Sequence, residues 1–80
     1  MTTPAQSRAA RGMLDWSQEK LADAAGVSLS TIRDFEKGRR TPMPQNLSAI
    51  RTALEVVGVE FIGSGEISSH GGPGIRLKSP

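Results

Sequence analysis

The side chains best suited to chemistry lie between Ser28 and Lys37, in the stretch SLSTIRDFEK. At helical spacing Ile32 and Phe35 fall on one side, with Glu36 at its edge. The other side carries hydroxyl, guanidinium, carboxylate and ammonium groups, together with the apolar side chain of Leu29; the polar residues are Ser28, Ser30, Arg33, Asp34 and Lys37. These groups donate or accept hydrogen bonds, so the pattern favours recognition of a binding partner.

No group of residues has the composition of a catalytic or metal site. The chain contains no cysteine, which excludes disulfides, thiolate catalysis and zinc–thiolate sites. The Ser, Asp and Glu residues fall on helix caps and surfaces, and His70 is the sole histidine, with no suitable ligand partner. We therefore expect neither an enzyme nor a bound cofactor or metal.

Two short helices joined by a tight turn, over residues 17–38, would position this face. Ser17 and Ser28 are each suited to cap a helix N-terminus, and Gly26 can end the first helix in a left-handed conformation. Apolar residues at the spacing of a hydrophobic staple flank both caps, in the pairs Trp16 and Leu21, and Val27 and Ile32. These dimensions predict a helix-turn-helix.

The same stretch carries a longer motif. It consists of Gln18, Glu19, Leu21, Ala22, Ala25 to Ser28, Thr31, Ile32, Phe35, Glu36, Gly38 and Arg40 to Pro42. With these residues the sequence resembles the XRE (phage repressor and Cro-like) family of helix-turn-helix transcriptional regulators. The resemblance implies a mainly α, compact, four-helix lambda-repressor-like domain whose third helix enters the major groove of DNA.

The resemblance also implies base contacts by Leu29, Ser30, Arg33 and Asp34. Arg33 could bind O6 and N7 of guanine, and Leu29 could contact a thymine methyl group. Ser30 could donate or accept, and Asp34 could accept from cytosine or orient Arg33. The alternative is that Arg33 and Asp34 form an ordinary solvated face.

Phosphate contacts are expected outside the base-reading face. Gln18 opens the second helix, where free backbone N–H groups favour an anion, and a basic cluster follows the third helix. The expected set is Gln18, Ser28, Lys37, Arg39, Arg40 and Asn46. Alternatively, the positive charges of the basic cluster could interact favourably with the dipole at the C-terminal end of the third helix. The cluster could have both roles.

The first helix has its own N-terminal signal and a link to the third helix. Thr3, Pro4 and Gln6 have the pattern of a capping box, followed by an expected inward face of Ala9, Ala10, Met13 and Leu14. The family resemblance implies an ion pair between Arg11 and Glu36. The alternative is that both charges are solvated.

The composition of the sequence changes at Gly58, after a predicted fourth helix that ends at Val57. Residues 59–62 and 75–78 alternate as β-strands do, and a polar segment between them is expected to be a mobile loop. We expect a helix-turn-helix domain over residues 1–57 and a C-terminal β extension over 58–80. A two-stranded ribbon is marginal by itself, so it must lie on the helices or pair with a second subunit. The candidate dimerisation residues are Val59, Phe61, Ile75 and Leu77, and Glu60 could pair with Arg76 across the strands.

The length and the net charge of the chain are compatible with a small DNA-binding protein, but they do not by themselves indicate one. The chain has 80 residues, a formal charge of +2 and a pI near 9.7, and no apolar run approaches the length of a membrane span. We expect a cytoplasmic homodimeric repressor that binds double-stranded DNA at a pseudo-palindromic operator, with a regulatory protein as a further candidate partner. One alternative is activation through contact with polymerase, and another is an antitoxin or anti-activator whose DNA contact is secondary.

Overall fold

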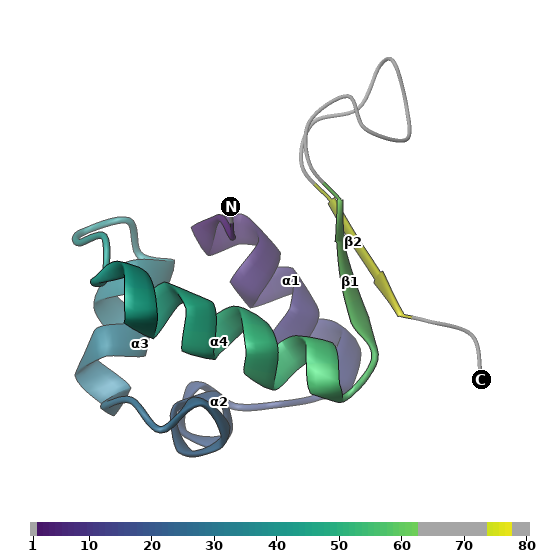
Figure 1. The fold of residues 1–80 in the computed structure, drawn as a ribbon, viewed down its shortest axis with the longest axis horizontal. Coiled ribbons are helices and arrows are strands. Elements are labelled where there is room, and N and C mark those ends of the chain that lie inside the picture. Colours follow the sequence, from purple (N-terminus) through teal and green to yellow (C-terminus); the bar gives the residue numbers. More distant parts are fainter. Residues whose placement is uncertain (1, 63–73, 78–80) are drawn as a thin grey trace.

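Four helices followed by a two-stranded antiparallel sheet make up the computed structural model, which describes residues 2–62 and 74–77 (Figure 1). The elements are α1 (Pro4–Leu14), α2 (Gln18–Ala25), α3 (Leu29–Glu36), α4 (Pro44–Val56), β1 (Val59–Ile62) and β2 (Gly74–Leu77). The prediction of four helices with a short C-terminal β extension is confirmed. The predicted loop, with His70, falls outside the described residues apart from Gly74, which belongs to β2.

Three of the helices begin at the capping residues that the sequence predicts. Thr3 and Gln6 form the capping box of α1, and Ser17 accepts a hydrogen bond from the backbone N–H of Lys20 at 3.0 Å. Ser28 accepts from Thr31 N–H at 3.2 Å. Because these short polar side chains satisfy backbone donors that a helix leaves unpaired, they determine where each helix starts.

One apolar core joins all four helices to β1. It consists of Ala10, Leu21, Ala22, Ile32, Phe35, Ile50, Leu54 and Val59. The expected inward face of α1 is partly wrong, since Ala9 and Met13 are exposed while Ser7 is buried. The helix is rotated because Ser7 and Arg11, one turn apart, both bind Glu36.

The sheet packs on the helices through one face. β1 and β2 pair in the register Val59 to Leu77 and Phe61 to Ile75, so these four side chains share a face as predicted. Val59 is buried, Phe61 and Ile75 pack against the core, and Leu77 is 43% exposed. The predicted Glu60–Arg76 ion pair is present across the strands.

The side chain of Gln6 connects α1 to the sheet by hydrogen bonds. Its Oε1 accepts from Thr3 N–H at 2.9 Å, while its Nε2 donates to the backbone carbonyl oxygens of Ile62 at 3.1 Å and Gly74 at 2.9 Å. One buried amide therefore completes a helix cap and binds both strands. Within residues 2–62 and 74–77, no helix is long and apolar enough to cross a membrane.

Candidate nucleic-acid interface

α3 lies at one end of the molecule and the sheet at the other (Figure 1). Ile32, Phe35 and Glu36 are buried and hold the helix against the core. Among the expected base-contact residues, Ser30 and Arg33 are exposed and Asp34 is half-buried. Leu29 is also half-buried and packs partly against the core, so only part of this side chain can reach a partner.

Three hydroxyl groups meet where α3 begins. Ser28 Oγ lies 3.1 Å from Ser30 Oγ and 2.8 Å from Thr31 Oγ1, in addition to accepting from Thr31 N–H. The capping hydrogen bond from Thr31 N–H therefore orients the Ser28 side chain. In each of the two hydroxyl pairs either oxygen can be the donor, and a phosphate oxygen that accepts from Ser28 would compete with these neighbours.

A hollow of about 230 Å³ gathers residues that the sequence analysis assigned from separate segments. It is lined by Ser30, Thr31, Asp34, Arg40, Thr41, Pro42, Met43 and Asn46. The turn after α3 builds it, because the backbone N–H groups of Arg39 and Arg40 donate to the carbonyl oxygen of Asp34 at 2.9 and 3.4 Å. Candidate base-contact and phosphate-contact residues thus share one concave surface.

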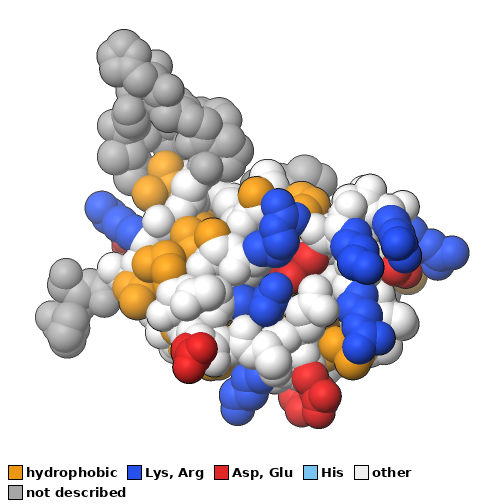
Figure 2. All heavy atoms as spheres, turned by 180° about the vertical axis from the view of Figure 1, so that it is seen from behind, with side chains coloured by type: hydrophobic (Ala, Val, Ile, Leu, Met, Phe, Trp, Pro, Cys, Tyr) orange, Lys and Arg blue, Asp and Glu red, His pale blue; other side chains and the backbone are white. Residues whose placement is uncertain are grey.

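Basic side chains surround this end of the molecule. Lys37, Arg39 and Arg40 are all exposed, and Figure 2 shows several Lys and Arg side chains on the half of the molecule that holds α3. A patch of this kind beside an exposed helix favours a polyanion by charge attraction.

The carboxylate of Glu36 joins α1, α2 and α3. Arg11 Nη2 donates to Oε1 at 2.7 Å and Arg11 Nε to Oε2 at 2.9 Å, while Ser7 Oγ donates to Oε2 at 2.5 Å. The Glu36 side chain is 1% exposed and that of Arg11 is 19% exposed, so the implied ion pair is present, with its carboxylate buried and its guanidinium partly buried. Arg8 also donates to the backbone carbonyl of Glu36.

The charge state of Glu36 reflects this environment. Burial by itself raises the pKa of the carboxyl, but the hydrogen bonds from Arg11, Ser7 and Gln18 and the positive charge of Arg11 outweigh it. The pKa of Glu36 is therefore below its ordinary value. The carboxylate remains ionised and holds its three side-chain donors.

Gln18 connects this network to the candidate phosphate contacts. Its Nε2 donates to Glu36 Oε1 at 3.1 Å, and the residue is the first of α2, directly after the Ser17 cap. A primary amide carries two N–H donors and the bond to Glu36 uses one. The sequence alone did not indicate Ser7, Arg8 and Gln18 as donors to Glu36. The spacing of Ser7, Arg8 and Arg11 on one side of α1 could have indicated the first two, whereas Gln18 lies on α2 and has no such local signal.

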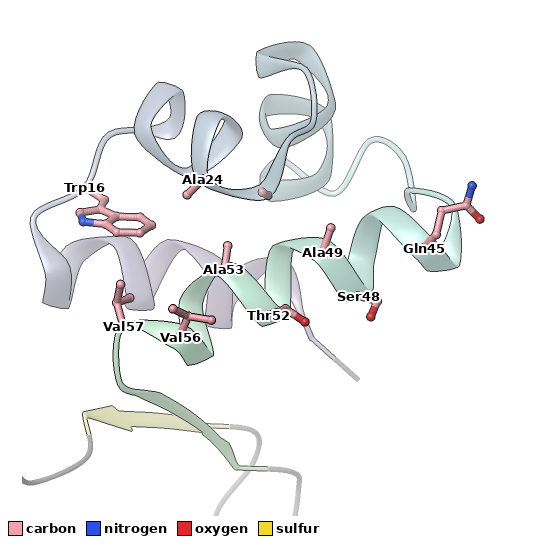
Figure 3. Close-up of a pocket in the computed structure, with 10 residues that line it drawn as sticks. Trp16, Ala24, Gln45, Ser48, Ala49, Thr52, Ala53, Val56 and Val57 are labelled. Atoms are coloured by element: carbon pink, nitrogen blue, oxygen red, sulfur yellow. The ribbon is translucent and has the colours of Figure 1, made fainter.

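An apolar groove of about 520 Å³ lies between α2 and α4 (Figure 3), and its lining includes none of the residues assigned to DNA. Its lining is uncharged and mostly small: Trp16, Ala24, Ala25, Gln45, Ser48, Ala49, Thr52, Ala53, Val56 and Val57. Val56 is 79% exposed. In residues 2–62 and 74–77, no three His, Cys, Asp or Glu side chains are grouped so that they could hold a metal ion.

Comparison with known families agrees with this geometry. A family model described as Helix-turn-helix matches residues 8–62, which cover the four helices from the middle of α1 onward and β1. A comparison with curated proteins finds no match. The fold, the exposed face of α3 and this match together show that the chain belongs to the XRE family of helix-turn-helix proteins, which are DNA-binding transcriptional regulators.

Proposed function

We propose that the protein is a homodimeric repressor that binds a pseudo-palindromic operator with α3 in the major groove. The observation that carries this proposal is the exposure of Arg33 and Ser30 on the side of α3 opposite the buried Ile32 and Phe35. Repression follows from occlusion, because a bound dimer covers promoter DNA. We further propose that the protein is not an enzyme and that it is located in the cytoplasm.

Arg33 is the residue that we assign to sequence discrimination. Its guanidinium can donate two parallel hydrogen bonds to O6 and N7 of guanine, which discriminates by about 1–3 kcal/mol against other bases. Ser30 can bind a neighbouring base edge. Asp34 lies in the shared hollow, where it can accept from cytosine or orient an arginine.

Phosphate contacts supply most of the affinity in this proposal. Lys37, Arg39 and Arg40 are exposed beside α3, and the start of α2 offers backbone N–H groups with Gln18. With three or four phosphates neutralised per subunit, log K should fall against log salt with a slope of about −3 per subunit. A dimer doubles that slope.

Dimerisation places two copies of α3 about one turn of DNA apart, on the order of 34 Å. The C-terminal strands are the proposed contact, because an isolated two-stranded sheet leaves backbone groups at both edges. Phe61, Ile75 and Leu77 remain partly or largely exposed. Val59 is buried in the core of its own chain, so its contribution to a dimer is through the backbone.

The proposal is tested by comparing Arg33→Ala with the wild type on a fluorescent upstream intergenic fragment and on scrambled DNA. We expect Arg33→Ala to lose most of the preference for the specific fragment while retaining salt-sensitive binding. Lys20→Ala is the control, since it removes one positive charge from an exposed position of α2 that belongs neither to the assigned DNA contacts nor to the sheet. Unchanged preference in Arg33→Ala would move specificity to other residues, and salt-independent binding would contradict the groove-binding role.

A second candidate function makes a protein the primary partner, as in an antitoxin or anti-activator. The groove between α2 and α4 favours it, because exposed apolar surface in a small domain often marks a protein contact. Co-expression with the product of the adjacent gene discriminates between the two. A stable complex combined with weak, sequence-independent DNA binding would support this second function.

A further inference from the structure

One large apolar side chain is exposed in the hollow beside α3. Met43 is 60% exposed and lines this hollow together with Ser30 and Asp34 of α3. Met43 therefore shares a concave surface with two of the candidate base-contact residues. The other large hydrophobic residues that are exposed in the described part of the chain do not line the hollow: Met13, Val56, Val57 and Leu77.

Two prolines restrict the backbone of Met43. Pro42 precedes it and Pro44 follows it, and a proline keeps the residue before it in an extended conformation. The ψ angle of Met43 is 149°, as this restriction requires. Its carbonyl oxygen also accepts hydrogen bonds from the N–H groups of Asn46 at 2.9 Å and Leu47 at 3.0 Å. The backbone that carries the side chain is thus fixed before a partner binds, so binding costs little further ordering.

The side chain of Met43 contributes little to the stability of the fold. Met43 is the N-cap of α4, a position where serine, threonine, aspartate or asparagine accepts a hydrogen bond from a free backbone N–H group. Methionine makes no such side-chain bond here, and most of the side chain lies outside the core. Its exposed apolar surface gains free energy when a partner covers it.

We infer that Met43 contacts the 5-methyl group of a thymine in the bound DNA and selects that base. This inference rests on the proposed function, in which α3 lies in the major groove, and it adds a specificity-determining residue outside α3. The 5-methyl group of thymine is an apolar group that a base pair presents in the major groove, and apolar side chains contact it. Because Ser30 and Asp34 line the same hollow, DNA held against α3 also covers Met43.

The sugars of the DNA backbone are the competing contact for Met43. Each sugar is flanked by phosphate groups, and the carboxylate of Asp34 in the same hollow repels a phosphate, whereas a base edge carries no net charge. Arg40 also lines the hollow, but this exposed side chain is long enough to bind a phosphate at the rim. The unbranched thioether chain of Met43 can adapt to the shape of a methyl group. The thymine contact is therefore favoured over the sugar contact.

DNA that contains uracil provides a direct test, because uracil lacks the 5-methyl group and still pairs with adenine. The upstream intergenic fragment is amplified once with thymidine triphosphate and once with deoxyuridine triphosphate. Fluorescence anisotropy measures the dissociation constants of both forms for the wild type and for Met43→Ser. Met13→Ser is the matched control, since Met13 is 44% exposed on α1 and does not line the hollow.

We expect the preference for the thymine form over the uracil form to be about fourfold larger in the wild type than in Met43→Ser, the factor that burial of one methyl group gives. A thymine contact by Leu29 is present in both proteins and cancels from this comparison. Met13→Ser should keep the wild-type preference, and so should Met43→Leu, which retains an apolar side chain. A difference below about twofold between the wild type and Met43→Ser would overturn the inference. This includes equal weakening on both forms, which would assign Met43 to the sugars.

Two further measurements separate this contact from effects on folding and on phosphate binding. Met43→Ser should melt at or above the wild-type temperature, because serine can accept from the N–H of Asn46 as the N-cap of α4. The slope of log K against log salt should stay unchanged, since an apolar contact displaces no counterions. A shallower slope in Met43→Ser would show that phosphate contacts of the same segment are lost, which would contradict the thymine contact.

The proposed function and this inference can fail separately. Wild-type protein that binds the upstream and the scrambled fragments equally would reject both. A preference that Arg33→Ala abolishes, without a methyl effect that depends on Met43, would keep the function and reject the thymine contact. A methyl effect that depends on Met43, with unchanged preference in Arg33→Ala, would keep the thymine contact and reject the role of Arg33.

Discussion

The guanidinium of Arg11 lies 2.7 Å from the carboxylate of Glu36, and the Glu36 side chain is almost fully buried. The pair joins α1 to α3, and Ser7 and Gln18 complete the donors around the carboxylate. The orientation of the exposed face of α3 therefore depends on a buried charge whose partners come from two other helices.

Arg11→Ala should destabilise the fold by on the order of 3 kcal/mol, because it leaves the buried carboxylate without its charged partner. Urea unfolding followed by circular dichroism measures the change. The control is Arg39→Ala, which removes an exposed arginine from the segment after α3 and should cost less than about 0.5 kcal/mol. Similar small losses in both variants would contradict the structural role of Arg11.

The stability of the protein should fall on the acid side in a way that depends on Glu36. Its pKa is lowered on folding, so the contribution is present above the ordinary value of 4.5 and is lost as pH falls from there through the folded pKa. Glu36→Gln should flatten this acid dependence, and Glu55→Gln should leave it nearly unchanged. Urea midpoints from about pH 7 to about pH 3 measure the slope.

Gln6→Glu should loosen the sheet while α1 remains capped. The carboxylate still accepts from Thr3 N–H but cannot donate to the carbonyls of Ile62 and Gly74. We expect the loss of these two hydrogen bonds to partly buried carbonyls to cost about 1–3 kcal/mol. Hydrogen exchange should accelerate in β1 and β2 more than in α2, and Ala5→Glu is the control at the exposed neighbouring position. Uniform acceleration in all elements would instead indicate global destabilisation.

Asp15→Gly should stabilise the protein by about 0.5–1 kcal/mol. Asp15 ends α1 with φ of 57°, a left-handed conformation that glycine adopts without strain. Gly26→Ala is the opposite case, since Gly26 has φ of 70° at the end of α2 and the substitution should destabilise. Thermal melts should move in opposite directions, and a lower melting temperature for Asp15→Gly would show that the aspartate side chain compensates the strain.

The helix starts and the strands could be predicted from the sequence because their signals are local. Thr3, Ser17 and Ser28 each satisfy a backbone donor three residues away, and residues 59–62 alternate with the period of a strand. The exposed face of α3 followed from the spacing of Ile32 and Phe35.

Tertiary structure decided which polar residues are buried, because burial depends on partners far apart in sequence. The spacing of α1 suggested Ala9 and Met13 for the core, whereas Ser7 is buried against Glu36, 29 positions away. Gln6 was expected only as a cap, yet it also binds Gly74, 68 positions away. Local pattern determined where the elements begin and end, while long-range hydrogen bonds to buried polar groups determined how they are rotated against one another.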